Sequence, residues 1–396
     1  MRTHRIGGVR RVILTALLVV AASAFVAAAM PARADLAGTE VKIGALLPLT
    51  GTLGFLGMQQ RVALEIAQEE INAAGGVGGK PFRFIVYDTE RKEASAIKAM
   101  RRLIAENVLA IFGPLSCRIA EAVFPISNRE KIPTITNSCG APNVMPKHRP
   151  WTFGNSMTED KLSGPIIARW VKEHGIKRAV ILYDKADDIS RGYGAFVAPK
   201  MLQANGVEVV DNLTFLTADV DYSAQITRAR ALNVNGLVIG ALAEQAAHIM
   251  REVQKQGLTV PVLGNQPITG YNFINLGGKA AEGVWAAATF WDANPNPKTK
   301  AFVEKFMKRD PQKNPPHAVA AGTYDSTSIL KMIIEQRGVT NRPEDLASDR
   351  EKIRQGWAAL KNYAGVMGLT SINEVGDGLK ESYTIKVKDG KWVRVE

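Results

Sequence analysis

Short apolar runs alternate with helical patterns along most of the chain. The runs at 179–183 (AVILY) and 236–240 (GLVIG) are apolar throughout, which is typical of parallel strands covered by helices on both faces. Between such runs, apolar residues recur at the three- and four-residue spacing of amphipathic helices. We therefore predict strands at 41–47, 82–88, 109–112, 133–136, 178–183, 207–213, 236–240, 261–264 and 284–289. The predicted helices are 57–74, 93–107, 117–130, 159–174, 191–205, 222–232, 244–257, 298–309, 317–336 and 350–361.

This alternation predicts an α/β fold with doubly wound parallel sheets and right-handed crossovers. Two polar, Pro-rich stretches, 143–150 and 292–297, interrupt it and separate one set of βα units from the next. The turn at 388–391 (KDGK) predicts a closing antiparallel hairpin. Two sheets joined at more than one point predict two lobes around a cleft, with a ligand held by the loops that follow the strands.

The first 34 residues have the three parts of a secretory signal. Several arginines precede an uncharged apolar run at 12–29, and Ala32-Arg33-Ala34 is a small-x-small cleavage site. We predict cleavage before Asp35 and export to the periplasm. The alternative is a membrane anchor, because the apolar run is nearly long enough to span a bilayer.

Charge and composition narrow the possible functions. The formal charge is +12, and removing the five arginines of residues 1–34 leaves +7, with the charges scattered and not gathered in a basic face. This distribution argues against nucleic-acid binding. The four mature histidines lack metal-ligand spacing, so we expect no metal and no cofactor. A mature chain of this length favours two domains.

Two strand-end loops are candidate ligand contacts. The segment 113–118 (GPLSCR) follows a strand and opens a helix, so its free N–H groups and the Ser116 hydroxyl suit a carboxylate. The loop 136–140 (TNSCG) follows the next strand and should lie beside it. In contrast, the glycine-rich segment 75–80 ends a helix and begins a strand, which is the reverse of a phosphate loop.

Cys117 and Cys139, the only cysteines, lie in these two loops. An oxidising compartment permits a disulfide between them, and otherwise they are small cleft residues. A cysteine nucleophile needs a nearby histidine, and none lies near either in sequence. The chain also lacks a Gly-x-Ser-x-Gly elbow, so we do not expect an enzyme.

Several motifs, in their order, resemble the branched-chain amino acid type of ABC-transporter solute-binding protein, a type I periplasmic binding protein. They include IGALLPLTG at 43–51, INAAGGVGGK at 71–80, FGPLSC at 112–117, IPTITNSCGAP at 132–142 and GTYD at 322–325. The resemblance implies two Rossmann-like lobes joined by three hinge crossings. The implied N-terminal lobe is 35–153 plus 287–370, and the C-terminal lobe is 154–286 plus 371–396. It also implies a monomer that closes on a small solute and presents it to the transmembrane permease subunits.

The resemblance also implies ligand residues, several of which depart from the family pattern. The place of the family's carboxylate-binding Ser is taken by Cys117, with Ser116 beside it, and the place of its Thr by Gly140, which should leave extra room. The place of the Glu that pairs with the ligand ammonium is taken by Gln266. The expected ligand-binding set is Phe55, Leu56, Ser116, Cys117, Ser138, Gly140, Tyr193, Gln266 and Tyr324, with Leu242 in an apolar wall and Arg91 a further candidate.

The loss of the anionic partner argues against a zwitterionic ligand. Burying an ammonium without its counter-charge costs roughly 3–5 kcal/mol, which weakens a micromolar site to about millimolar. We therefore expect an aromatic or short aliphatic carboxylate or amide and not a standard branched-chain amino acid. The alternatives are a true amino-acid binder of the same family, a ligand sensor for a signalling regulator, and a secreted hydrolase.

Overall fold

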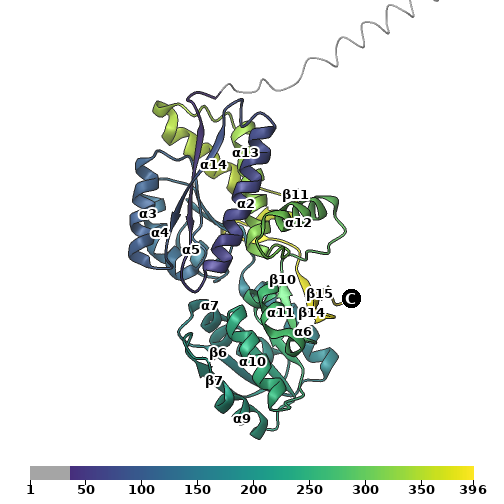
Figure 1. The fold of residues 1–396 in the computed structure, drawn as a ribbon. Helices are drawn as coiled ribbons and strands as arrows, with labels where there is room; N and C mark the ends of the chain where they lie inside the picture. The colour runs from purple at the N-terminus through teal and green to yellow at the C-terminus, as the bar shows by residue number, and fades with distance from the viewer. Residues whose placement is uncertain (1–35) are drawn as a thin grey trace, which may run out of the picture. The chain divides into compact units, whose positions relative to one another are not determined.

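The structure is a computed structural model that describes residues 36–396. Strands and helices alternate along this part of the chain, and the strands form three sheets (Figure 1). The predicted signal segment, residues 1–34, lies outside the described residues. Within residues 36–396, no helix is both long and apolar enough to cross a membrane.

The first sheet is parallel and has the strand order β2-β1-β3-β4-β5. Its interior strand β1 is buried along its length except at Lys42, as expected for a strand covered by helices on both faces. The strands are β1 (Val41–Leu47), β2 (Phe82–Asp88), β3 (Ile111–Phe112), β4 (Thr134–Thr136) and β5 (Thr152–Gly154).

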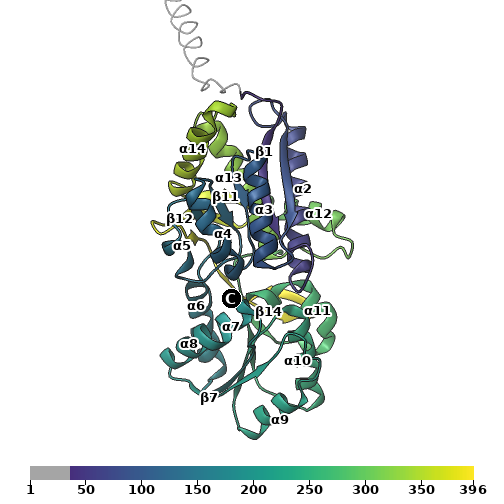
Figure 2. The same ribbon diagram turned by 90° about the vertical axis from the view of Figure 1, so that its left-hand side faces the viewer.

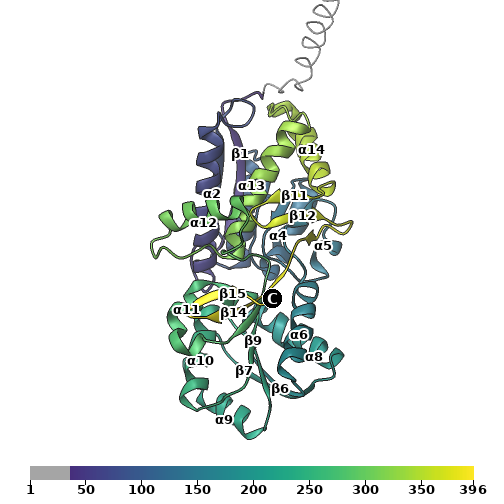
Figure 3. The ribbon, with the colours of Figure 1, turned by 90° about the vertical axis from the view of Figure 1, so that its right-hand side faces the viewer.

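Helices cover both faces of this sheet. One face packs on α3 and α4, through residues such as Leu103 and Val123, and Figure 2 looks onto this side. The other face packs on α2, α13 and α14, through residues such as Leu64, Leu330 and Trp357. Figure 3 shows these three helices from the opposite side. The helices of this half are α2 (Gly54–Ala73), α3 (Glu93–Ala105), α4 (Cys117–Arg129), α5 (Val144–Lys147), α12 (Pro297–Arg309), α13 (Ala318–Gln336) and α14 (Leu346–Ala358).

The second sheet has the order β15-β14-β10-β9-β8-β6-β7 and ends in an antiparallel hairpin. The turn at 388–391 joins β14 to β15, as the sequence predicts. The strands are β6 (Arg178–Asp184), β7 (Glu208–Phe215), β8 (Gly236–Gly240), β9 (Val262–Gly264), β10 (Trp285–Ala288), β14 (Tyr383–Lys388) and β15 (Lys391–Arg394).

Two helical layers also enclose the second sheet. Helices α6 and α8 pack on one face through Trp170 and Leu202, and α9, α10 and α11 pack on the other through Ile226, Met250 and Phe273. The helices are α6 (Glu159–His174), α7 (Asp188–Arg191), the π-helix η1 (Gly192–Val197), α8 (Ala198–Ala204), α9 (Ser223–Ala231), α10 (Ala243–Lys255) and α11 (Tyr271–Gly277). Short 3₁₀ helices are η2 (Gln266–Thr269), η3 (Gly278–Ala281) and η4 (Pro343–Asp345).

A small third sheet, which the sequence pattern does not predict, consists of β11 (Tyr363–Gly365), β12 (Gly368–Ile372) and β13 (Gly378–Leu379). The buried Asp325 carboxylate of α13 anchors it by accepting the N–H groups of Val366 and Met367 at 2.8 and 3.0 Å. A bridge between Gly154 and Asp377 ties this segment to β5 of the first sheet.

The chain passes between the two large sheets three times. It leaves the first sheet after β5, returns after β10 to form α12 and α13, and leaves again before β14. Two parallel α/β halves joined in this way form the fold that the resemblance implies. The carboxyl ends of β1, β3 and β4 in one half, and of β6 and β9 in the other, carry the loops of interest.

Candidate ligand-binding site

Loops from both halves enclose a cavity of about 290 Å³. Its walls come from the segments that follow β3 and β4 in the first half and β6 and β9 in the second, together with the starts of α2, α6 and α13. This is the position that strand-end geometry predicts for a ligand of two open α/β sheets. Six of the nine expected ligand residues line it: Leu56, Cys117, Ser138, Gly140, Tyr193 and Gln266.

The other three expected residues do not line the cavity. Ser116 is buried and caps α4, where its Oγ accepts the Ile119 N–H at 3.5 Å. Phe55 packs against an apolar cluster that contains Leu242, which also does not line the cavity, and the wall residues Leu56, Leu115 and Val319. Tyr324 points from α13 toward α2, where its hydroxyl donates to Glu70. Its ring lies 4.6 Å from the ring of Phe302 of α12.

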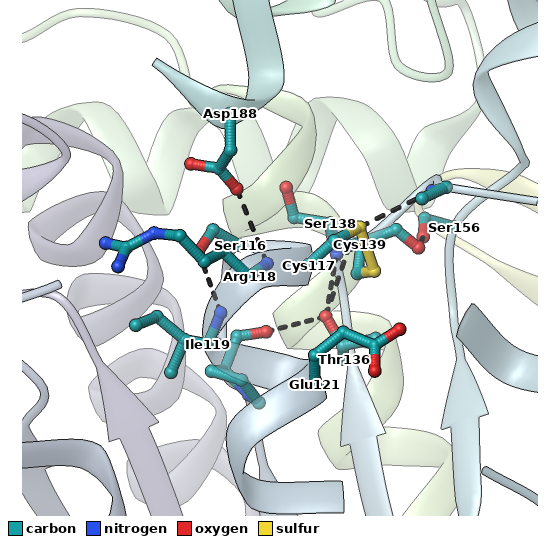
Figure 4. The surroundings of a disulfide bond; sticks show 12 residues. Ser116, Cys117, Arg118, Ile119, Glu121, Thr136, Ser138, Cys139, Ser156 and Asp188 are labelled. Carbon is teal, nitrogen blue, oxygen red and sulfur yellow. Dashed lines mark hydrogen bonds between the residues drawn. A yellow bond between two sulfur atoms is a disulfide. The ribbon is translucent and has the colours of Figure 1, made fainter. Parts of the chain in front are cut away.

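The floor of the cavity is tied together by a disulfide between Cys117 and Cys139, whose Cα atoms are 4.8 Å apart (Figure 4). This pairing is one of the two alternatives that the sequence allows. Cys117 is the first residue of α4 and Cys139 lies in the loop after β4, so the bond joins neighbouring strand-end loops. The Ala141 N–H also donates to Cys117 Sγ at 3.4 Å.

Thr136, at the end of β4, orders the same floor. Its hydroxyl donates to the Pro114 carbonyl at 2.7 Å and accepts the N–H groups of Ser138 and Cys139 at 3.3 and 3.2 Å (Figure 4). Gly113, with φ of 98°, cannot be replaced freely, because a Cβ there would lie 2.2 Å from the Leu46 carbonyl oxygen. The backbone therefore fixes where Ser138 meets the cavity.

The expectation that Gly140 leaves extra room is wrong. A Cβ at this position would lie 2.9 Å from the Met157 carbonyl oxygen, and the Gly140 carbonyl accepts the Glu159 N–H at 2.8 Å. The space beside Gly140 is occupied by the backbone of the crossing into α6. Glycine at this position therefore brings the start of α6, with the Glu159 side chain, to the cavity wall.

Gln266 lies on the second-half wall, at the start of η2. Its Nε2 donates to Thr289 Oγ1 at 3.0 Å, and its Oε1 has no hydrogen-bond partner within residues 36–396. The side chain is uncharged at the place where the resemblance expects a glutamate. Gln266 therefore offers the cavity a hydrogen-bond acceptor and no full negative charge.

His317, which no sequence pattern marks, also lines the cavity. Its Nδ1 accepts the Val319 N–H at 3.2 Å, so Nε2 carries the proton and donates to Thr269 Oγ1 at 3.1 Å. Burial lowers the pKa of His317 to about 4, although a hydrogen bond to the Gln266 backbone opposes this. The imidazole is therefore neutral at physiological pH.

Arg91, a candidate charge partner for the ligand, is already paired. It lies just after β2 in the first half, and its guanidinium binds Asp187 and, at 2.5 Å, Asp188 of the second half. Asp188 lines the cavity, and its Oδ2 also accepts the Arg118 N–H at 3.4 Å (Figure 4). Arg91 therefore links the two halves at the edge of the cavity.

The segment predicted as one helix over 191–205 is divided into α7, η1 and α8. The six-residue π-helix η1 places Tyr193, which is 2 % exposed, and Phe196, which is 68 % exposed, on the same cavity. Gly194 fits against β6 only without a side chain, since a Cβ would lie 2.3 Å from Tyr183 Cβ. π-helical turns of this kind are frequent at functional sites.

The fold and the cavity at its strand ends define a solute-binding receptor of the type I class. The model of the family described as "Periplasmic binding protein" matches residues 40–391, so the chain belongs to this family. Its members are periplasmic solute-binding proteins of ABC transporters and not enzymes.

Individual relatives agree with this assignment. The chain is 25 % identical over 371 residues to the Leu/Ile/Val-binding protein BraC3 of Rhizobium johnstonii, covering 92 % of this chain and 96 % of that protein. A leucine-binding protein LivK of Thermotoga maritima has a similar structure, with a TM-score of 0.79, 28 % identity and coverage of 90 % and 98 %. A solute-binding protein of Rhodopseudomonas palustris BisB5, solved with 3,4-dihydroxybenzoic acid, has a TM-score of 0.79, 23 % identity and coverage of 90 % and 97 %.

Proposed function

We propose that the protein is the receptor of an ABC importer, exported by a cleaved signal at 1–34, and that it captures a small organic solute in the cavity between its two halves. The observation that carries this proposal is the cavity itself, whose walls come from strand-end loops of both sheets. A ligand that touches both walls stabilises a closed arrangement, because its contacts form fully only when the halves meet. The closed monomer then engages transmembrane permease subunits.

The halves act as the two lobes of this closing motion. The sequence predicts the N-terminal lobe as residues 35–153 plus 287–370 and the C-terminal lobe as residues 154–286 plus 371–396. Strand pairing supports small shifts of two limits, because β10 pairs with β9 and β14 of the second sheet up to Ala288. The third sheet, which ends at Leu379, is tied to β5 of the first. We place the second crossing after Ala288 and the third between Leu379 and Tyr383.

The ligand we propose has an apolar body and one polar end, an aromatic or short aliphatic carboxylate or amide. Leu56, Leu115, Ile189, Phe196 and Val319 supply apolar walls for the body. The polar end meets the Ser138 hydroxyl beside the start of α4, where the helix dipole favours an acceptor atom. A protein with the same fold was solved with benzoate, which fits this general chemistry.

A standard branched-chain amino acid is the second candidate, because relatives that match nearly the whole chain are named Leu/Ile/Val-binding proteins. The uncharged Gln266 argues against it. An ammonium group on this wall would face an amide oxygen instead of the carboxylate that the family resemblance expects.

A thermal-shift screen tests this proposal with branched-chain amino acids, aromatic acids, short aliphatic acids and the matching amides. A ligand present at 100 times its Kd adds about 2.7 kcal/mol to the free energy of unfolding. We expect aromatic or aliphatic acids or amides to stabilise the protein and to reduce its radius of gyration in solution scattering. Strong stabilisation by leucine or valine, with all the acids and amides inert, would contradict the proposed ligand class.

A further inference from the structure

The charged groups around the cavity are unbalanced. Among the described side chains that line it, two are carboxyl groups, Glu159 and Asp188, and none belongs to a lysine or an arginine. Asp188 is compensated by the Arg91 guanidinium and by the Arg118 N–H. Glu159 forms no ion pair within residues 36–396. A bound ligand therefore meets one carboxyl group that the protein leaves without a cation.

Glu159 also keeps hydrogen-bonding capacity for the ligand. Its Oε1 accepts the Ser163 hydroxyl at 2.5 Å, and its Oε2 has no partner among the described residues. Burial raises the pKa of Glu159 against the opposing hydrogen bond from Ser163, and the nearby Asp160 raises it further. A negatively charged group placed beside this carboxyl would suffer repulsion or require Glu159 to be protonated.

Two other polar side chains that line the cavity, Gln266 and Ser138, also have hydrogen-bonding atoms without a partner in the described residues. Gln266 Oε1 is an acceptor without a partner in residues 36–396, because the amide nitrogen is committed to Thr289. The Ser138 hydroxyl, also without a partner there, donates or accepts. A group with N–H donors for Glu159 and Gln266 and an acceptor for Ser138 would satisfy all three side chains.

We propose that the ligand presents an uncharged carboxamide, and not a carboxylate or an ammonium, to the polar side chains of Ser138, Glu159 and Gln266, which line the cavity. This inference rests on the proposed receptor function and selects one of the two head groups that it leaves open. The amide NH₂ donates to the acceptors, and the amide oxygen accepts from Ser138. An ammonium is disfavoured because Gln266 is neutral, Asp188 is already paired with Arg91, and burial raises the pKa of Glu159, which favours the uncharged form of that carboxyl group.

Isothermal titration at pH 7.5 with matched solutes tests this choice. Benzamide, benzoate and benzylamine share a ring and differ in the head group, and butyramide and butyrate repeat the comparison with an aliphatic body. We expect each amide to bind at least about tenfold more tightly than its acid, and benzamide to bind more tightly than benzylamine. A carboxylate or the amine binding tighter than the matched amide would overturn the inference while leaving the receptor function intact. Failure of all five solutes to bind would instead count against the proposed function.

The variant Glu159→Gln tests whether the Glu159 carboxyl group disfavours a carboxylate ligand. We expect benzoate to bind several-fold more tightly than it does to the unaltered protein, because the repelling group is removed, and the preference for benzamide to shrink. The matched control is Glu173→Gln on the same helix, where Glu173 is exposed and pairs with Arg169 at 2.6 Å. It should leave all five affinities unchanged. An unaltered ratio of benzamide to benzoate affinity in a folded Glu159→Gln protein would contradict the role of Glu159.

Discussion

Gln266, which lines the cavity, and Thr289 are joined by a hydrogen bond of 3.0 Å that holds the amide nitrogen of Gln266 against the end of β10 and leaves its oxygen without a partner in residues 36–396. The pair fixes the polarity of the second-half wall. Because the Gln266 side chain is neutral, its amide oxygen selects solutes that carry a hydrogen-bond donor and does not select them by charge. A carboxylate at the same position would favour an ammonium.

The variant Gln266→Glu should gain affinity for leucine. A carboxylate in place of the amide supplies the counter-charge that a buried ammonium needs, and a gain of about 1.4 kcal/mol corresponds to a tenfold lower Kd. Titration calorimetry with leucine should therefore give at least a tenfold decrease in Kd relative to the unaltered protein. The control Gln266→Leu has a similar volume without charge and should not improve leucine binding. Equal leucine affinity in the Glu and Leu variants would show that position 266 does not set charge selectivity.

Removing the disulfide should destabilise the ligand-free protein. The bond joins residues separated by 22 positions, and a loop of that length contributes about 3 kcal/mol by restricting the unfolded chain. We expect the double variant Cys117→Ser, Cys139→Ser to lose roughly this free energy of unfolding in urea. Dithiothreitol should lower the stability of the unaltered protein by a similar amount and leave the double variant unchanged. A reductant effect of equal size on both proteins would exclude the disulfide as its cause.

Elements with strong periodicity were predictable from the sequence almost to the residue. The strands β1 and β2 and the helix α6 begin and end where the pattern places them. Each is at least seven residues long, and each is either a largely apolar strand or an amphipathic helix, so the pattern has enough positions to define it. In contrast, β5 has three residues and the third sheet has strands of two to five, which are too short for any period to emerge.

Part of the cavity was also predictable, because strand-end loops must face the opposite sheet. That rule located the loops of Cys117 and Ser138, and the family resemblance located Gln266. It does not locate Glu159, whose approach depends on a backbone contact with Gly140 across the crossing into α6. Tyr324 shows the limit of a resemblance, since the rotation of α13 about its axis directs this side chain to Glu70 and not to the cavity.

The buried His317 predicts a loss of stability in acid. The folded protein keeps this imidazole neutral down to pH about 4, whereas the unfolded chain protonates it near its ordinary value of 6.5. Because the unfolded state then binds more protons, the contribution of His317 is fully present above pH 6.5 and declines as the pH falls to 4, by about 3 kcal/mol in total. Urea unfolding at pH 7.5 and 4.5 should show most of this loss.

The variant His317→Asn isolates the contribution of the imidazole. Asparagine is a good N-cap and can still accept the Val319 N–H, but it does not titrate. Other acids with raised pKa values, such as Glu159 and Asp325, titrate in both proteins, so their contributions to the change in stability cancel in the comparison. We expect the unaltered protein to lose more stability between pH 7.5 and 4.5 than the variant does. Parallel pH profiles for the two proteins would contradict the assignment.

Arg91 should determine how firmly the two halves close. Its guanidinium joins the loop after β2 to Asp187 and Asp188 after β6, and the Asp187 side chain is fully buried. Removing one partner of such a pair leaves a buried charge uncompensated in the closed arrangement, which costs about 3–5 kcal/mol. We therefore expect Arg91→Ala to raise the Kd of any captured solute at least tenfold and to leave the ligand-saturated protein more expanded in solution scattering.

The neighbouring Lys92, whose pair with Glu90 is exposed, supplies the control. Lys92→Ala should change neither quantity, because exposed ion pairs contribute little to stability. An Arg91→Ala protein that binds and compacts like the unaltered one would show that this ion pair does not stabilise closure.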